Sequence, residues 1–191
     1  MTISYWLDQS HKKAQSTYDI AIIGAGIAGL STAYWLVKED PELKICVIDK
    51  NRMGHGASGR NAGFVTCGSV EHFNRLVSKH GDDEALEIWR FSETNLDLLK
   101  SEIIQDDSQE IDFEHKGSFS LASSDSEFTE LKESAALMKR LGIEVDTLTE
   151  ADIKRRLGAD NFVGGIKYIG DGSVNPVKLL QKIRSKIETI G

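Results

Sequence analysis

The sequence predicts an α/β fold, and three observations support this prediction. Short apolar runs at residues 20–23 and 46–48 flank an amphipathic helical pattern, which is the order of a βαβ unit. Helical and strand patterns then keep alternating to the end of the chain. The chain has 191 residues, of which 40% are hydrophobic, so it can form a core in one or two domains.

The first apolar run leads into a G-x-G-x-x-G turn at residues 24–29. Gly24 suits the tight turn, Gly26 lets backbone N–H groups approach a pyrophosphate, and Gly29 lets the helix lie close to the strand. The helix N-terminus offers free N–H donors and a partial positive charge. Asp49 lies twenty positions after Gly29, at the end of the second strand, where it can accept hydrogen bonds from ribose hydroxyls. The segment therefore predicts a Rossmann-like site for an adenine dinucleotide. The alternative is that the glycines only fit a tight βα turn.

The other elements follow from periodicity and from capping residues. The first helix carries Ile27, Leu30, Tyr34 and Val37 on one face and ends at Asp40-Pro41. The later patterns predict helices over 69–80 and about 83–104, a strand over Phe113–Ala122 with a bend or bulge at Gly117, a helix that starts with a capping box at Ser124-x-x-Glu127 and stops at Gly142, a strand over Val145–Leu148, a short helix from Thr149 to Gly158, a strand over Gly164–Tyr168 and a helix that starts at Pro176.

A doubly wound sheet needs a third parallel strand beside the first two, and no good candidate follows Asp49. The chain stops at Gly191, directly after the last helix. We therefore expect this chain to be the N-terminal part of a longer protein. Because an unpaired sheet edge seeks partners, we also expect self-association through that edge.

Composition narrows the class of protein and of partner. The net charge of −7 argues against nucleic acid or an anionic membrane as the main partner. No apolar run is long enough to predict a transmembrane segment, and the polar N-terminus does not resemble a signal peptide. Two cysteines exclude a disulfide scaffold, and the histidines lack metal-ligand spacing, so no metal site is predicted. A cytoplasmic location fits best.

A second informative stretch follows Asp49. It has four glycines within residues 54–63, and this scarcity of side-chain bulk lets the backbone wrap a flat ligand closely. Ser58, Arg60 and Asn61 add hydrogen-bond donors for phosphate or for ring carbonyls. We interpret the stretch as a ligand-binding loop, and the alternative is a flexible surface loop.

These motifs together resemble a known family. The segments IAIIGAGIAGLSTAYWL, VIDK and GASGRNAGF, with residues 170–176 before a helix, resemble the D-amino-acid oxidase / glycine oxidase / sarcosine oxidase (DAO) family of FAD-dependent oxidoreductases. The resemblance runs from about Tyr18 to Gly191. It implies an incomplete Rossmann-like FAD-binding domain and part of an α+β substrate domain built on a mostly antiparallel sheet. The implied division is an N-terminal extension (1–17), the N-terminal part of the FAD-binding domain (18–110), a substrate-domain segment (111–169) and a return helix of the FAD-binding domain (170–191).

The resemblance also implies roles for single residues. The diphosphate would be lined by the turn residues Gly24, Gly26, Ile27, Ala28 and Gly29, and the chain would return to it at Ala57 and Ser58. The adenosine ribose would lie at Asp49 and Lys50. The isoalloxazine would be approached by Arg60, Asn61, Ala62 and Gly63. Some relatives tether the flavin through a histidine, and Arg60 stands at that position here, so we expect non-covalent FAD. No catalytic residue is assigned.

The implied reaction is oxidation of the C–N bond of a small-molecule amino acid or secondary amine, by hydride transfer to flavin. In this family the substrate-binding groups lie mostly beyond Gly191, so we expect the 191-residue chain alone to be inactive. One alternative is a non-catalytic dinucleotide-binding fragment or subunit. Another is an NAD-dependent dehydrogenase, which explains Asp49 equally well but leaves the glycine-rich loop without a role.

Overall fold

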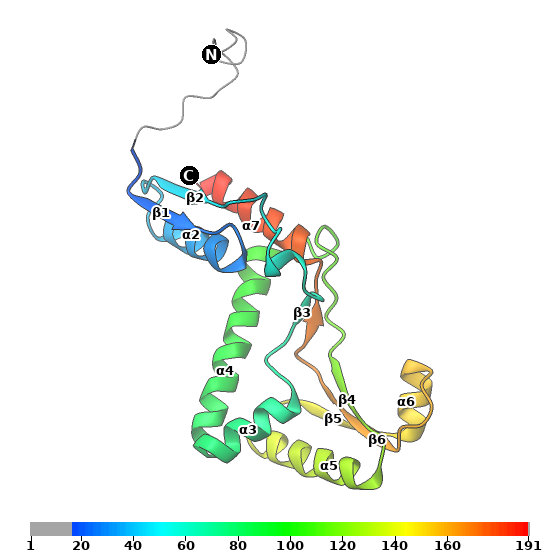
Figure 1. Ribbon diagram of the computed structural model, residues 1–191. Helices are drawn as coiled ribbons and strands as arrows, with labels where there is room; N and C mark the ends of the chain where they lie inside the picture. Colours follow the sequence, from blue (N-terminus) through cyan, green and yellow to red (C-terminus); the bar gives the residue numbers. More distant parts are fainter. Residues whose placement is uncertain (1–16, 191) are drawn as a thin grey trace. The chain divides into compact units, whose positions relative to one another are not determined.

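A computed structural model describes residues 17–190, so the predicted extension lies outside the described residues except for Thr17. The chain divides into two compact units (Figure 1). Unit 1 holds the described residues up to Arg60 together with those from Leu180 onward, and unit 2 holds Asn61–Leu179. The division into four domain segments remains a prediction.

Unit 1 contains the predicted βαβ unit. Strands β1 (Ile20–Ile23) and β2 (Ile45–Ile48) are parallel, with Ile20 opposite Ile45. Helix α2 (Ile27–Glu39) connects them and ends at Asp40, as the sequence predicts. Its buried face carries Leu30, Ala33, Tyr34 and Val37. Ile27, which was expected on that face, is 42% exposed, because it lies in the first turn beside the glycine-rich segment.

Unit 2 is built on a three-stranded antiparallel sheet, which confirms the mostly antiparallel sheet expected here. Its strands are β4 (Ser118–Ala122), β6 (Gly164–Tyr168) and β5 (Val145–Thr149), and β6 is central. The unit also contains α3 (Val70–His80), α4 (Asp82–Leu98), α5 (Asp125–Arg140), α6 (Glu150–Leu157) and a short ladder of β3 (Phe64–Val65) with β7 (Gly172–Ser173). Helix α7 (Pro176–Ile190) begins in unit 2 and ends in unit 1.

The core of unit 2 joins helices α3, α4 and α5 to the sheet. Phe73 and Tyr168 each pack edge-to-face on the buried ring of Trp89, with ring centroids 5.4 and 5.3 Å apart. Met138 of α5 and Ile166 of β6 belong to the same apolar cluster. Edge-to-face pairs of this kind add to the stabilisation that burial gives. The core therefore fixes α4 against β6.

Three elements depart from the sequence prediction. The strand expected over 113–122, with a bend or bulge at Gly117, is broken at that residue: Gly117 has φ +77°, Glu114 pairs with Ser173, and β4 begins at Ser118. The helix expected to about residue 104 is α-helical to Leu98, and a π-helical segment (η2, Leu99–Ile104) continues it.

The third departure is the capping box of α5. The Ser124 hydroxyl accepts the Glu127 N–H, as a capping box requires. The Glu127 carboxylate, however, accepts the N–H of Ser123, at 2.7 Å, rather than that of Ser124. The Glu127 side chain therefore still reaches back to the backbone before the helix, one residue upstream of the position that a capping box requires.

Candidate functional site

The candidate dinucleotide site lies where β1 ends and α2 begins, within unit 1. The Gly24 N–H donates to the carbonyl oxygen of Ile48 at 2.7 Å, which joins the turn to the end of β2. Helix α2 has no acidic residue in its first turn. The positive end of the helix therefore faces no carboxylate from its own first turn, and this arrangement favours an anionic ligand.

Side chains from the two motifs bond to the backbone N–H groups of the turn. The Ala25 N–H donates to a carboxylate oxygen of Asp49 at 2.8 Å, and the Ile27 N–H donates to the Ser58 hydroxyl at 2.9 Å. The fold thus brings the G-x-G-x-x-G turn, the acid after β2 and the glycine-rich loop together. Both donors are exposed, so oxygen atoms of a diphosphate can replace the side-chain oxygens there.

At two of the three glycines, an added Cβ atom would come too close to a neighbouring atom. A Cβ atom on Gly29 would lie 1.9 Å from the carbonyl oxygen of Gly24, so only glycine allows the helix to pack this closely on the turn. A Cβ atom on Gly26 would lie 2.9 Å from the Ser58 hydroxyl. A side chain at Gly26 would therefore crowd Ser58, beside the two exposed donors. The turn has the geometry that the backbone approach of a pyrophosphate requires.

Asp49 uses both carboxylate oxygens in this structure. One accepts the Ala25 N–H, and the other accepts the Asn51 N–H at 2.8 Å. The backbone hydrogen bonds from Ala25 and then Asn51 lower the pKa of Asp49 below its ordinary value. An ionised carboxylate can accept further bonds at each oxygen. Its ribose-binding role remains a prediction, and the contact with Ala25 is an additional one that sequence reasoning missed.

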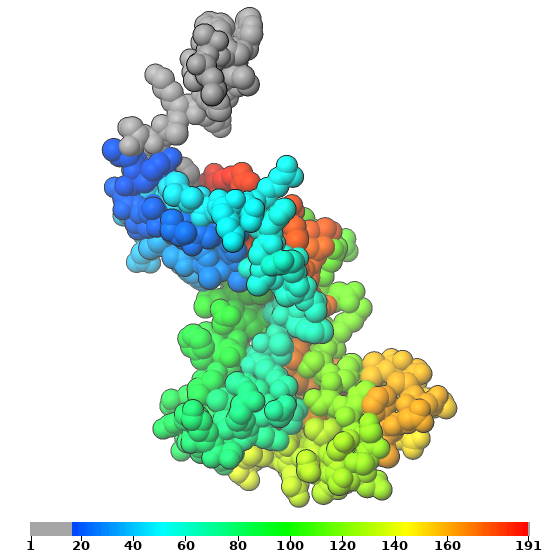
Figure 2. Space-filling model, in the orientation of Figure 1, coloured from blue at the N-terminus to red at the C-terminus, as the bar shows by residue number. Residues whose placement is uncertain are grey.

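The glycine-rich loop after β2 lies on the surface, coloured cyan in Figure 2. It forms a short 3-10 turn (η1, Ala57–Gly59), and the Arg60 side chain bends back so that its Nε donates to the Gly56 carbonyl at 3.3 Å. Lys50 and Arg60 are exposed. Their contacts with ribose and with the flavin ring therefore remain predictions.

The rest of the predicted loop belongs to unit 2. The Asn61 side-chain oxygen accepts the Gly63 N–H at 2.8 Å, which gives this part of the loop a fixed local bend. Asn61 and Ala62 are exposed and Gly63 is buried. A role of these residues at the isoalloxazine stays a prediction.

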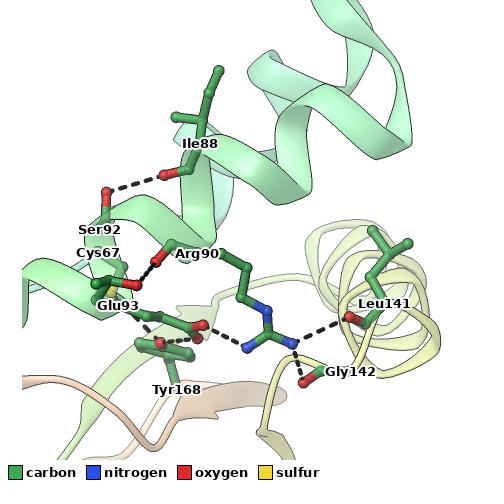
Figure 3. Close-up of polar contacts among 9 residues, drawn as sticks. Cys67, Ile88, Arg90, Ser92, Glu93, Leu141, Gly142 and Tyr168 are labelled. Atoms are coloured by element: carbon green, nitrogen blue, oxygen red, sulfur yellow. Dashed lines mark hydrogen bonds and ion pairs between the residues drawn. The ribbon is translucent and has the colours of Figure 1, made fainter. Parts of the chain in front are cut away.

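A polar cluster in unit 2 was not predicted from the sequence (Figure 3). The Tyr168 hydroxyl donates to Glu93 at 2.8 Å, and Arg90 pairs with Glu93 and donates to the Gly142 carbonyl at 2.8 Å. Burial, followed by the hydrogen bonds with Cys67 and Glu93, raises the pKa of Tyr168. Arg90 and Glu93 thereby join α4 to β6 and to the turn after α5. The cluster lines a cavity of about 270 Å³.

The described residues hold neither a candidate metal centre nor a candidate membrane-spanning helix. Among residues 17–190, no group of three or more His, Cys, Asp or Glu side chains has the proximity that a metal ion needs. None of the helices in that part of the chain combines the length and the apolar character that a membrane crossing requires.

Comparison with known proteins places the chain among flavin enzymes. Residues 19–191 match the family described as "DAO: FAD dependent oxidoreductase". The probable oxidoreductase OrdL of Haemophilus influenzae is 30% identical over 161 residues, which cover 83% of this chain and 36% of that protein. The mitochondrial L-2-hydroxyglutarate dehydrogenase of Dictyostelium discoideum is 32% identical over 157 residues, 80% of this chain and 31% of that protein.

The solved structure of glycine oxidase from Geobacillus kaustophilus has a similar fold. It superposes with a TM-score of 0.67 at 23% sequence identity, over 91% of this chain and 45% of that one. In these comparisons the chain spans between 31% and 45% of the length of its relatives.

Proposed function

The chain belongs to the family of FAD dependent oxidoreductases, and from this premise we propose that it is the N-terminal, FAD-binding part of an enzyme that oxidises the C–N bond of an amino acid or secondary amine. The family match confirms the resemblance drawn from the three N-terminal motifs and from residues 170–176. The proposal adds the bond that is oxidised, the binding mode and the residues that hold the cofactor.

One observation supports the site more than any other. The Ala25 and Ile27 N–H groups lie at the positive end of α2, and their bonds to Asp49 and Ser58 join the two predicted motifs at one point. Exposed N–H donors on a helix with no acid in its first turn bind phosphate oxygens. Gly26 has no side chain, so its backbone can approach such a group, whereas a Cβ atom there would lie 2.9 Å from the Ser58 hydroxyl.

We infer the following division of work. The N-terminus of α2 holds the diphosphate, Asp49 and Lys50 hold the ribose, and Ala57 and Ser58 return to the diphosphate. FAD, when bound, supplies the acceptor for a hydride from the substrate carbon. Residues 60–63 pack against the isoalloxazine and orient it. Because Arg60 replaces a possible tethering histidine, the cofactor is held without a covalent bond.

The cytoplasm is our proposed compartment. Both cysteines of the chain, Cys46 and Cys67, carry free thiols, as expected in a reducing environment. Burial raises the pKa of Cys67, so this thiol resists ionisation and oxidation.

A second candidate reaction has a specific observation behind it. The 32% identical relative is named as a dehydrogenase of L-2-hydroxyglutarate, a hydroxy acid rather than an amine. The same dinucleotide-binding half could therefore serve the oxidation of a C–O bond. The likeness to the glycine oxidase structure, at 23% identity, establishes the fold alone and does not decide between the two reactions. The resemblance of the sequence motifs to the D-amino-acid oxidase / glycine oxidase / sarcosine oxidase family favours the amine.

Anaerobic mixing separates the two candidates. The full-length protein with bound FAD is mixed with amino acids, with N-methyl amines and with 2-hydroxy acids, and loss of the oxidised-flavin absorption is followed. We expect an amino acid or amine to bleach the flavin and to yield a carbonyl product with release of ammonia or an amine. Bleaching by 2-hydroxy acids alone would replace our proposal by the second candidate. Reduction by NADH alone would contradict both.

A further inference from the structure

The segment Gly170-Asp171-Gly172-Ser173-Val174-Asn175-Pro176 has no role in the site described above. Its acid, Asp171, is only 2% exposed. Within the described part of the chain, the buried polar residues are Asp171 and Ser134, and Ser134 is 6% exposed. A buried carboxyl group is costly unless hydrogen bonds satisfy it. Its retention at this position therefore calls for a reason.

Asp171 joins two distant segments through neutral donors. The hydroxyls of Thr66 and Ser118 donate to one carboxyl oxygen at 2.8 and 2.5 Å, and the Cys67 N–H donates to the other at 3.2 Å. None of the ion pairs among residues 17–190 includes Asp171. Three directed bonds fix the position of residues 66–67 more closely than a solvated ion pair would.

Residues 172–174 of the same segment form hydrogen bonds with the residues at the end of the glycine-rich loop. The Val174 N–H donates to the Gly63 carbonyl at 2.8 Å, and the β3–β7 ladder sets Phe64 opposite Ser173. Gly63 has φ +73°, and a Cβ atom there would lie 2.0 Å from the Val174 carbonyl oxygen. Residues 171–174 therefore form hydrogen bonds or strand pairs with the segment from residue 63 to residue 67. Asp171 bonds to the last two residues of that segment, Thr66 and Cys67.

We propose that Asp171 is a positioning residue for the flavin. It fixes residues 63–67 and thereby the conformation in which residues 60–63 face the isoalloxazine. It does not touch the cofactor itself. The inference rests on the proposed function, because it assumes that the loop contacts FAD.

Substitution of Asp171 tests this role in the full-length protein reconstituted with FAD. Asp171→Ala removes all three acceptor contacts, and we expect the FAD dissociation constant to rise about tenfold, which corresponds to 1.4 kcal/mol. We also expect the visible absorption bands of the bound flavin to shift, because the environment of the ring changes. Asp171→Asn keeps an acceptor for the Cys67 N–H, so its dissociation constant should lie between those of the parent and of Asp171→Ala.

Ser134→Ala is the matched control. Ser134 is also buried, and its hydroxyl accepts from Asn74 and donates to the Glu130 carbonyl, in a different part of unit 2. This variant should lower the melting temperature but leave the flavin spectrum and the FAD dissociation constant unchanged. A loss of stability alone therefore does not reproduce the expected result.

Three outcomes would overturn the inference. If Asp171→Ala binds FAD with the parent's dissociation constant and spectrum, Asp171 is structural only, and the proposed function still stands. If the parent protein takes up no FAD, the proposed function fails and this inference fails with it. If Asp171→Ala does not fold, Thr66→Val decides, because it removes one of the three donors. It should shift the spectrum in the same way, and an unshifted spectrum would contradict the inference.

Discussion

Asp49 and Ser58 show at the residue scale how the two motifs meet. Their place in a dinucleotide site could be predicted from the sequence, because such a site combines a glycine-rich turn with an acid at a characteristic distance along the chain. Their bonds to the Ala25 and Ile27 N–H groups could not, since those depend on how the loop folds back over the turn. The buried position of Asp171 was also hidden, because its partners Thr66 and Cys67 lie more than 100 residues earlier in the chain.

Replacement of Gly26 by valine tests the turn directly. Gly26 has φ −90° and ψ −173°, a conformation open to any residue, so the fold should survive. The new side chain would displace the Ser58 hydroxyl, which lies 2.9 Å from the Cβ position, and would block the diphosphate. We expect Gly26→Val to raise the FAD dissociation constant at least about tenfold. Titration of the apo-protein followed by flavin fluorescence measures it.

Thr149→Ala is the control for this prediction. Thr149 caps α6 in unit 2, outside the candidate site, so its loss should lower stability and leave FAD binding as in the parent. Equal FAD affinity of Gly26→Val and the parent would remove this turn from the site.

Asp49→Ala should raise the FAD dissociation constant about tenfold, because hydrogen bonds to a charged group are stronger than those between neutral groups. The effect combines the lost ribose contacts with the loss of the acceptor for Ala25 and Asn51. Isothermal titration of apo-protein with FAD gives the difference, and thermal unfolding without FAD separates the loss of fold stability. An unchanged binding constant would show that Asp49 is not part of the site.

The lowered pKa of Asp49 predicts a pH dependence of stability. Its folded-state pKa lies below the unfolded value of about 3.9, so its stabilising contribution is fully present above that pH and is lost as the pH falls through the folded pKa. We expect the difference in unfolding free energy between the parent and Asp49→Asn to shrink between about pH 5 and about pH 2. Denaturant titrations across this range measure it, and a constant difference would show that the two amide contacts are not made in solution.

At the scale of elements, capping residues in the sequence predict where most of the helices begin and end. Thr149 starts α6 with a complete capping box, in which its hydroxyl accepts the Asp152 N–H and Asp152 accepts the Thr149 N–H. Gly158 ends the same helix in the left-handed conformation. Each of these signals depends only on residues close together in the chain, so it can be recognised in the sequence. In the sequence, Gly117 likewise indicates a bend. The pairing of residue 114 with Ser173 and the π-helical end of α4 depend on tertiary contacts and packing, which no local pattern records.

Thr149→Ala should destabilise unit 2 by about 1 kcal/mol, the usual cost of losing an N-cap residue. The alanine leaves the Asp152 N–H without its side-chain acceptor. Chemical denaturation of the parent and of the variant gives this free-energy difference. FAD affinity should stay unchanged, and a variant as stable as the parent would mean that the capping box adds nothing to the fold.

At the scale of the whole molecule, unit 1 presents a two-stranded parallel sheet among the described residues. The end of each strand carries an exposed isoleucine: Ile23 is 80% exposed and Ile48 is 48% exposed. Apolar side chains beside an unpaired strand edge favour association. The sequence offers no good candidate for a third parallel strand after Asp49, and the expectation of an unpaired edge rests on this.

We therefore expect the isolated 191-residue chain to self-associate, to bind FAD poorly and to show no amine-dependent oxygen uptake or dye reduction. Mass in solution, flavin content and an assay with amino acids and N-methyl amines test this expectation together. A monomeric, flavin-saturated chain that turns over one of these substrates would place the whole active site within residues 1–191 and would contradict it.

The central claim is that the N-terminus of α2, with Asp49 and Ser58, forms an FAD site. The most direct measurement is the flavin content and visible spectrum of the purified full-length protein, before and after saturation with FAD. We predict a yellow protein with about one FAD per chain, released intact when the protein is unfolded, as expected for a non-covalent cofactor. A colourless protein that takes up no added FAD would contradict the account.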